Sequence, residues 1–177
     1  HIPLATLADD VSIITLVSPS KTFNIPGLGL SSLVVDNRQH WKAIKQVFDR
    51  LHISAFNPFS IAAFEAAYRG GEAWLDELMH YLDQTRQMVT ELFESKAPQI
   101  KVIASQGTYL LWLDCRALGL NDDDLKSFFI NKAKVGMNPG ISFGEVGSGF
   151  MRMNIAAPRQ VITDACQAIV QAVNNGV

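Results

Sequence analysis

The sequence predicts a mixed architecture that consists of the end of an α/β domain, a long bridging helix and a small α+β unit. Short apolar runs rich in β-branched residues flank a polar connection near the N-terminus, which is typical of buried strands. Apolar residues at helical spacing then continue from Glu72 to Pro98, too far for an ordinary surface helix of one small unit. Strand-like and helical patterns alternate from there to the C-terminus.

Composition limits the classes of function. The 177 residues are 48% hydrophobic and 18% charged, and 15 Lys and Arg stand against 17 Asp and Glu, for a net charge of -2. Without a basic stripe, nucleic acid is not expected as a partner. No apolar run approaches the ~20 residues that span a bilayer, so no membrane partner is expected either. Cys115 and Cys166 lie outside any CxxC pair, which favours a reducing compartment and a cytoplasmic location.

The N-terminal part contains two predicted strands and two predicted helices. The strands are expected at 11–17 and 30–35, and an amphipathic helix at 38–51. A second helix follows Asn57 and Pro58, which suit its N-cap and first position, and ends at Gly70-Gly71. Because the chain begins at His1 rather than Met, we expect it to be a piece of a longer protein.

The remaining elements are predicted after Gly71. The long helix is followed by strands at 101–104 and 108–113, and a helix begins at the acidic run 121–124. A glycine-punctuated segment, 136–149, then leads into a strand at 150–155 and a last helix that Pro158 opens. The predicted domain boundary lies at the start of the long helix, with 1–72 on one side and 73–177 on the other.

Lys21 lies at the tip of the connection between the first two strands, beside Ser18 and Ser20. Lysine is rarely buried, so a solvated amine is the simplest interpretation. A Ser18-x-x-Lys21 acyl-transfer pair is a second, although Pro19 and the strand context disfavour it. A third is a Schiff-base lysine that binds pyridoxal phosphate, with the two hydroxyls as donors to the phosphate. The residues alone leave these alternatives open.

Four segments together carry a resemblance to a known family. They are SPSKTFNIPGL (18–28), NPFSIAAFEAAYRGGEAWL (57–75), GTYLLWLDCRALGL (107–120) and VGMNPGISFGEVGSGFMRMNIAAPR (135–159). In this order the chain resembles the fold-type I pyridoxal-phosphate enzymes of the aspartate aminotransferase superfamily. Within them it is most similar to the MalY/PatB branch of class I/II aminotransferases and cystathionine β-lyases.

The resemblance implies a fold, a cofactor and site residues. The chain would be the C-terminal part of the fold-type I transferase fold, with 1–72 from the large cofactor-binding domain and 73–177 as bridging helix and small domain. Lys21 would form the Schiff base with pyridoxal 5'-phosphate and shuttle protons. Ser18, and more weakly Ser20, would contact the cofactor phosphate. Arg152 would bind the substrate α-carboxylate, since a guanidinium matches a carboxylate with two parallel hydrogen bonds.

The resemblance also implies an activity. Gly29 stands where many aminotransferases of the superfamily carry a phosphate-binding arginine, which favours a C–S β-lyase that converts cystathionine or cysteine to pyruvate, ammonia and a thiol. An aminotransferase that passes the amino group to a 2-oxo acid is the alternative. A second alternative is that this chain alone is a non-catalytic fragment or assembly domain. A homodimer and a small amino-acid substrate are the expected partners.

Other motifs receive structural interpretations. Asp122, Asp123 and Asp124 fit the first turn of a helix better than a calcium loop. The glycine segment fits a loop that presents Arg152 better than a phosphate loop, because a strand follows it. His40, His52 and His80 are expected to be ordinary helix residues, and no metal site is expected. Trp41, Trp74 and Trp112 are expected in the core.

Overall fold

A computed structural model describes residues 2–7, 10–54 and 57–176 of the chain. The chain divides into two compact units, 1–77 and 78–177. The division falls within the long helix, and each unit is described separately below. The assignment of the units to a large and a small domain stays a prediction. No helix of the described ranges combines the length and apolar character needed to cross a membrane.

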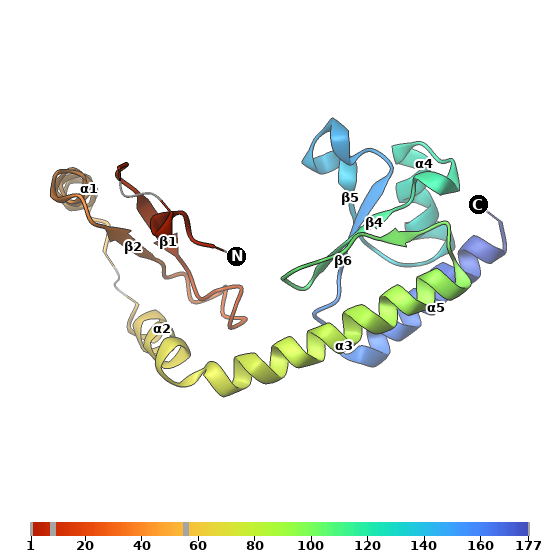
Figure 1. The fold of residues 1–177 in the computed structure, drawn as a ribbon, viewed down its shortest axis with the longest axis horizontal. Coiled ribbons are helices and arrows are strands. Elements are labelled where there is room, and N and C mark those ends of the chain that lie inside the picture. The colour runs from red at the N-terminus through yellow and green to blue at the C-terminus, as the bar shows by residue number, and fades with distance from the viewer. Residues whose placement is uncertain (1, 8–9, 55–56, 177) are drawn as a thin grey trace. The chain divides into compact units, whose positions relative to one another are not determined.

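The first unit contains a two-stranded antiparallel sheet and two complete helices (Figure 1). Its elements are β1 (Ile14–Val17), β2 (Ser32–Val35), α1 (Arg38–Arg50) and α2 (Pro58–Gly70), followed by the start of α3 (Glu72–Lys96). Strand pairing aligns Ile14 with Val35 and Val17 with Ser32. The predicted helix starts are confirmed, because the side chain of Asn37 caps α1 and that of Asn57 caps α2.

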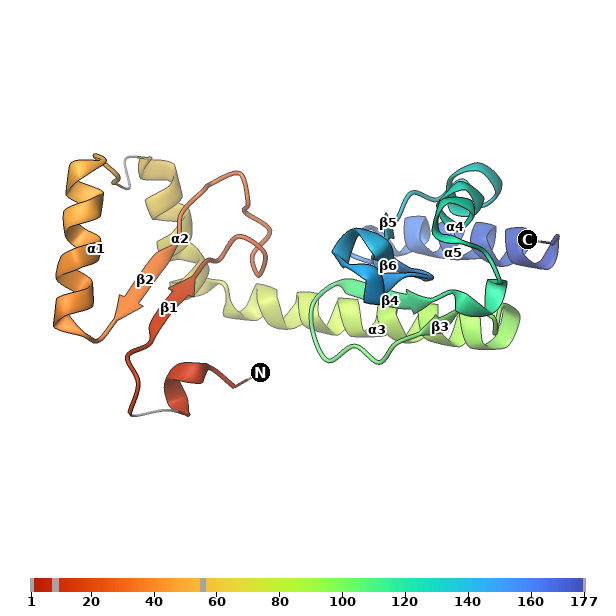
Figure 2. The ribbon, with the colours of Figure 1, turned by 90° about the horizontal axis from the view of Figure 1, so that it is seen from above.

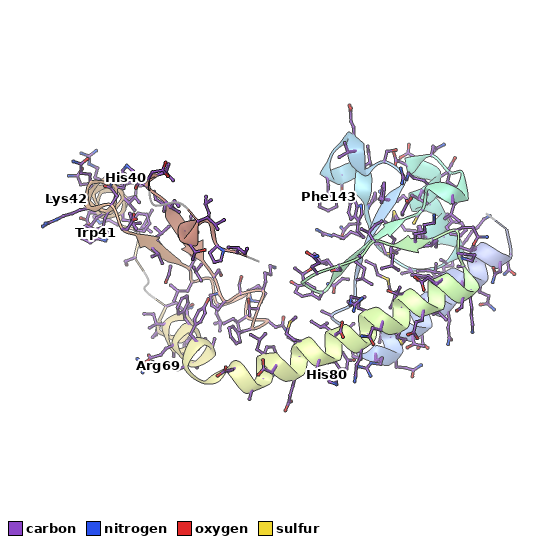
Figure 3. The ribbon with its side chains drawn as sticks, viewed as in Figure 1. His40, Trp41, Lys42, Arg69, His80 and Phe143 are labelled. Atoms are coloured by element: carbon purple, nitrogen blue, oxygen red, sulfur yellow. The ribbon has the colours of Figure 1, made fainter. Side chains whose placement is uncertain are left out.

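Apart from Pro19, the first unit holds none of the buried hydrophobic residues of the described chain. Trp41 on α1 is 51% exposed and Trp74 on α3 is 47% exposed, so their predicted place in the core is wrong (Trp41 is marked in Figure 3). Helical spacing indicates which face of a helix is apolar, but it does not say what covers that face. His52 lies beyond the end of α1 with φ 52°, so it is not a helix residue.

The second unit is built on a four-stranded antiparallel sheet in the order β3-β4-β6-β5. The strands are β3 (Lys101–Val102), β4 (Leu110–Asp114), β5 (Asn138–Pro139) and β6 (Phe150–Asn154), and the helices are α4 (Asp122–Ser127) and α5 (Arg159–Asn174) beside the rest of α3. A π-helical turn, Phe128–Lys132, continues α4. Three-residue 3-10 turns of this unit lie at Arg116–Leu118 and Glu145–Gly147, and a longer one at Gly140–Phe143; the first unit has one at Leu4–Thr6.

The core lies between one face of this sheet and the helices. Leu111 and Leu113 of β4 and Met151 and Met153 of β6 are buried, and they alternate with partly exposed residues as strand geometry requires. They form one cluster with buried side chains of α3, α4 and α5. Helix α5 lies alongside α3 (Figure 2), where the Thr163 hydroxyl is 3.3 Å from Met88 Sδ.

The opposite face of the sheet carries the polar residues of interest. Because side chains alternate along a strand, Trp112 and Arg152 point away from the core that Leu111 and Met151 enter. Trp112 is therefore half-buried rather than part of the core, contrary to the prediction. Its ring stacks on Phe150 at 5.7 Å between centroids and meets Phe143 edge-on at 5.7 Å.

Candidate active site

Lys21 lies in a single helical turn that follows β1. The backbone N–H of Phe23 donates to the carbonyl of Pro19 at 2.9 Å, and that of Ile25 donates to the carbonyl of Ser20 at 3.0 Å. Asn24 closes the turn in the left-handed region, with φ 53°, a conformation that asparagine tolerates better than most residues. Lys21 is exposed on this turn, so its amine is accessible to a ligand.

Ser18 and Ser20 bring two hydroxyls together beside Lys21 in the chain. The Ser18 hydroxyl is 3.1 Å from that of Ser20 and 3.3 Å from the carbonyl oxygen of Leu30, and it accepts the Ser20 N–H at 3.3 Å. A hydroxyl has one proton, so Ser18 donates to one of these oxygens at a time. An exposed amine next to two hydroxyls is a donor set that fits an aldehyde which also carries a phosphate.

Aromatic packing fixes the Lys21 turn to the junction of α2 and α3. The ring of Phe23 stacks on Trp74, with 6.2 Å between centroids, and meets Tyr68 edge-on at 5.9 Å. Gly71, between the helices, leaves room for it: a Cβ there would lie 2.5 Å from the Phe23 ring and 2.5 Å from the carbonyl oxygen of Ala67. The turn is thus held through the residue two positions after Lys21.

Arg152 lies on β6, where it is flanked by Trp112 on β4 and Asn138 on β5 in the strand register. Its Nη2 donates to Asn138 Oδ1 at 3.0 Å, and its Cζ lies 4.6 Å from the centroid of the Phe143 ring. Its Nε is buried and makes no hydrogen bond within the described residues. Among the described contacts only Nη2 has an acceptor, so the guanidinium keeps further N–H donors that an anion could accept.

The predicted site residues are thus divided between the two units. Ser18, Ser20 and Lys21 lie in the first unit, and the structure places them within one turn of each other. Arg152 lies in the second unit with partners of its own. Their roles stay predictions, and each half of the site is characterised by its own contacts.

Two residues that contact Arg152, and a third that binds the chain just before its strand, have roles that the sequence did not reveal. Asn138 and Phe143 contact its guanidinium, and Figure 3 marks Phe143 in the segment between β5 and β6. Asp122 accepts hydrogen bonds from the Ser148 hydroxyl at 2.8 Å and the Gly149 N–H at 2.9 Å, just before β6. An Asn-Pro pair and a first-turn acid are common local patterns, so only the strand register and tertiary contacts reveal these roles.

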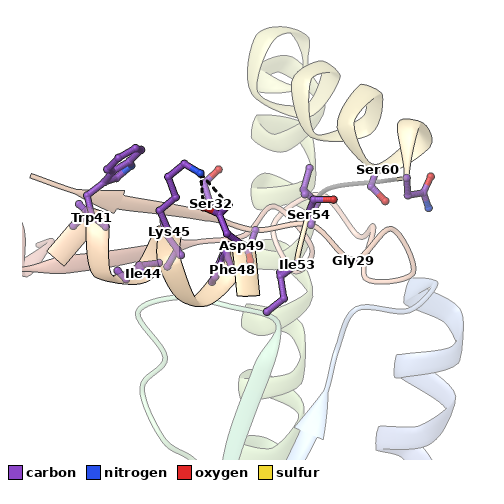
Figure 4. A pocket seen from close by; sticks show the side chains of 15 residues that line it. Gly29, Ser32, Trp41, Ile44, Lys45, Phe48, Asp49, Ile53, Ser54 and Ser60 are labelled. Atoms are coloured by element: carbon purple, nitrogen blue, oxygen red, sulfur yellow. Dashed lines mark hydrogen bonds and ion pairs between the residues drawn. The ribbon is translucent and has the colours of Figure 1, made fainter. Parts of the chain in front are cut away.

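A groove of about 850 Å³ lies elsewhere on the first unit, against β2, α1 and the chain after α1 (Figure 4). Apolar side chains such as Trp41, Ile44 and Phe48 line it, and Lys45 and Asp49 form an ion pair at 2.7 Å along the same helix. An exposed pair of this kind contributes little to stability. Ser18, Ser20 and Lys21 are not among the lining residues, but Leu30 is, and its carbonyl oxygen lies 3.3 Å from the Ser18 hydroxyl.

Both cysteines are free and buried. Burial, together with the nearby negative charge of Asp114, raises the pKa of the Cys115 thiol from 9.0 to about 12. Burial alone raises the pKa of the Cys166 thiol to about 12. Neither thiol is a nucleophile near neutral pH, because the thiolate is the reactive form. No cluster of three metal-ligating side chains is present among the described residues.

The fold and the Lys21 turn point to one class of protein, and comparison with family models identifies that class. The model of the aminotransferase class I and II family matches residues 1–169, so the chain belongs to that family. Cystathionine β-lyase PatB of Bacillus subtilis (strain 168) is 35% identical over 176 residues, which are 98% of this chain and 46% of the relative. The chain spans about half the length of the curated relatives it matches, and the resemblance inferred from the sequence is confirmed.

Solved structures give the same result. A pyridoxal-phosphate-bound putative aminotransferase from Clostridium difficile 630 is 41% identical, with a TM-score of 0.87 over 91% of this chain and 42% of that chain. Cystalysin from Treponema denticola, which contains pyridoxal 5'-phosphate, is 34% identical, with a TM-score of 0.86 over 92% of this chain and 41% of that chain. The predicted fold class, the C-terminal part of the fold-type I transferase fold, is confirmed.

Proposed function

We propose that this chain carries the cofactor lysine and the substrate-carboxylate arginine of a pyridoxal-phosphate-dependent C–S β-lyase. The observation that carries the proposal is an exposed lysine, Lys21, in a fixed turn that follows Ser18 and Ser20 in the chain, whose hydroxyls lie 3.1 Å apart. The similarity to PatB supports the choice of reaction. The cofactor, when bound, supplies an electrophilic carbonyl and an electron sink for charge that develops at the substrate Cα.

The residues of this chain would act in three ways. Lys21 Nζ would hold the cofactor through its carbonyl carbon and, as a free amine, would accept the proton from the substrate Cα. The hydroxyls of Ser18 and Ser20 donate hydrogen bonds to the cofactor phosphate. Arg152 binds the α-carboxylate and thereby orients the Cα–H bond for proton removal. Loss of the thiolate from Cβ, followed by hydrolysis, then yields a thiol, pyruvate and ammonia.

Trapping the lysine tests the cofactor assignment on the chain itself. Borohydride reduction of the chain with pyridoxal 5'-phosphate should fix the label on Lys21, as peptide mapping would show. The exposed Lys42 on α1, which has no neighbouring hydroxyl pair in the described contacts, is the internal comparison. Label distributed equally over Lys21, Lys42 and the other lysines would contradict the assignment.

An aminotransferase is the second candidate, because the solved structure from Clostridium difficile 630 is described as a putative aminotransferase. In the cofactor-loaded protein, pyruvate release from L-cystathionine measures the lyase reaction, and glutamate formed from 2-oxoglutarate measures amino transfer. Lys21→Ala should abolish either activity, whereas Lys42→Ala should leave it unchanged. Efficient amino transfer without pyruvate release would reverse the choice between the two reactions.

We also propose a cytoplasmic homodimer. The two free, buried thiols of Cys115 and Cys166 support a reducing compartment. The assembly rests on the family resemblance. Light scattering of the purified protein measures the mass of the assembly, and cell fractionation measures its location. A monomer at micromolar concentration, or recovery in a membrane or extracellular fraction, would contradict this proposal.

A further inference from the structure

We propose that Asn138 and Phe143 are positioning residues that hold Arg152 so that one edge of its guanidinium faces the substrate carboxylate. The proposal rests on the proposed function of Arg152 and adds how that function is built. It is carried by three contacts within the second unit: a hydrogen bond, a cation–π contact and the register of β5 against β6.

The strand register places Asn138 directly opposite Arg152. Cross-strand partners in an antiparallel pair have side chains on the same face of the sheet, close enough to interact. The hydrogen bond from Arg152 Nη2 to Asn138 Oδ1 is 3.0 Å long, within the normal range. Pro139 follows Asn138 and restricts the backbone of the residue before it, so the short strand holds this amide in place.

Phe143 contacts the same guanidinium. Its ring centroid lies 4.6 Å from Arg152 Cζ, within the range of a cation–π contact. The Trp112 ring makes a T-shaped contact with Phe143, with 5.7 Å between the centroids. A carboxylate that makes two parallel hydrogen bonds approaches in the plane of the guanidinium, so a contact that fixes this plane also fixes the direction of approach.

The free edge follows from the remaining contacts. Nε of Arg152 is buried, and one hydrogen of Nη2 is used by Asn138, so a carboxylate meets the end formed by Nη1 and Nη2. The acceptor at position 138 is an amide, which orients the guanidinium without neutralising its charge. An aspartate in that place would orient it equally well and would also compete with the substrate for the positive charge.

The amide is therefore the testable feature. In the cofactor-loaded protein, Asn138→Ala should raise KM for an amino-acid substrate about tenfold, the effect of one hydrogen bond to a charged group, and should change kcat less than about twofold. Asn138→Asp should raise KM further, while the urea concentration at which the protein unfolds is unchanged or higher.

Phe143→Leu should raise KM about threefold. Asn131→Ala changes an exposed asparagine of the same unit whose side chain contacts Ser127, and it should leave KM unchanged.

The Asn138→Asp variant separates positioning from a structural role. If Asn138 only stabilised the sheet edge, the isosteric carboxylate would keep the hydrogen bond to Arg152 and KM would stay at the wild-type value. That result would overturn the inference. An unchanged KM in Asn138→Ala, with a raised KM in Arg152→Ala, would overturn it while leaving the proposed function intact. An unchanged KM in Arg152→Ala would refute both.

A second readout needs no turnover. In the full chain, the Nε–Hε NMR signal of Arg152, identified by its absence in Arg152→Lys, should shift on titration with sodium acetate. The shift should need higher acetate concentration in Asn138→Asp than in wild type, and the same concentration in Asn131→Ala. A signal that does not respond to acetate in the wild-type chain would contradict the inference.

Discussion

Asp122 accepts the backbone N–H of Gly149 at 2.9 Å, a contact between the first turn of α4 and the residue that precedes β6. The other oxygen of the same carboxylate accepts the Ser148 hydroxyl at 2.8 Å. Gly149 has φ 78°, in the left-handed region that favours glycine, so its backbone conformation also depends on the absence of a side chain. The Asp122 carboxylate thus binds the end of the glycine-punctuated segment, 136–149, immediately before the strand that carries Arg152.

We expect Asp122→Ala to lower the free energy of unfolding by about 1.5–3 kcal/mol, because two hydrogen bonds to a charged group are lost. Asp123→Ala is the matched control, since Asp123 lies in the same first turn and interacts with the same helix dipole. It should cost only about 0.3–1 kcal/mol. Urea unfolding followed by circular dichroism gives both values. Equal losses in the two variants would show that Asp122 acts through the helix dipole alone.

Gly71→Ala should displace the Phe23 ring and with it the turn that carries Lys21. The added Cβ would lie 2.5 Å from the ring and 2.5 Å from the carbonyl oxygen of Ala67, and backbone cannot yield as a flexible side chain can. We expect a loss of about 1–3 kcal/mol, as for other overpacked sites. At Gly70 a Cβ meets nothing within 4 Å, so Gly70→Ala should be neutral or slightly stabilising. Near-ultraviolet circular dichroism reports on the packing of the aromatic cluster and should differ between the two variants. Identical spectra would contradict the packing of Phe23 against Gly71.

The cysteines predict how stability depends on pH. Each folded thiol has a pKa raised from 9.0 to about 12, so the unfolded chain loses these protons first as pH rises. The stabilisation is fully present below pH 9.0 and is lost progressively between pH 9.0 and about 12, by about 1.4 kcal/mol per pH unit for each thiol. Cys166→Ala should reduce this slope in urea unfolding measured across the alkaline range. A slope that is the same in the variant and the wild type would contradict the burial of Cys166.

Arg159 joins the start of α5 to α3. Its Nη2 donates to the Tyr81 carbonyl at 3.3 Å and to Gln84 Oε1 at 3.0 Å, and its Cζ lies 4.5 Å from the centroid of the Tyr81 ring. We expect Arg159→Met to lower the free energy of unfolding by about 1–2 kcal/mol. Arg86→Met, which removes the exposed pair with Asp83, should cost less than about 0.5 kcal/mol. Thermal unfolding of both variants measures this difference. Equal shifts in Tm would show that the contacts of Arg159 stabilise the fold no more than the Arg86–Asp83 pair does.

The sequence predicted the elements whose signal is local. The apolar period predicted α1 and the long α3, and Asn57, Pro58 and the glycine pair after Arg69 predicted the bounds of α2, whereas the Asn37 cap of α1 is seen only in the structure. These features depend on residues within one or two turns, so they can be recognised without tertiary information. The strands were placed within a few residues, although β3 is only Lys101–Val102.

Features that depend on distant contacts could not be predicted. Strand β5 has two residues and one of them is Pro139, so it has no alternating pattern to recognise. The role of Asn138 comes from its register against β6, and that of Asp122 from a partner 27 positions away. Lys21 and Arg152 came from family resemblance. The contacts made by the residues that surround them are seen only in the structure.

Helix α3 joins a unit in which Pro19 is the one buried apolar side chain among the described residues to a unit with a dense core. A single helix therefore differs along its length in its tolerance of substitution. Along its first turns, Trp74 and Met79 are each 47% exposed, whereas Val89 and Phe93 further along are fully buried. A saturation library across α3 would therefore show a gradient within one continuous helix. Polar replacements would persist near its start and disappear towards its end, at positions with equal helix propensity.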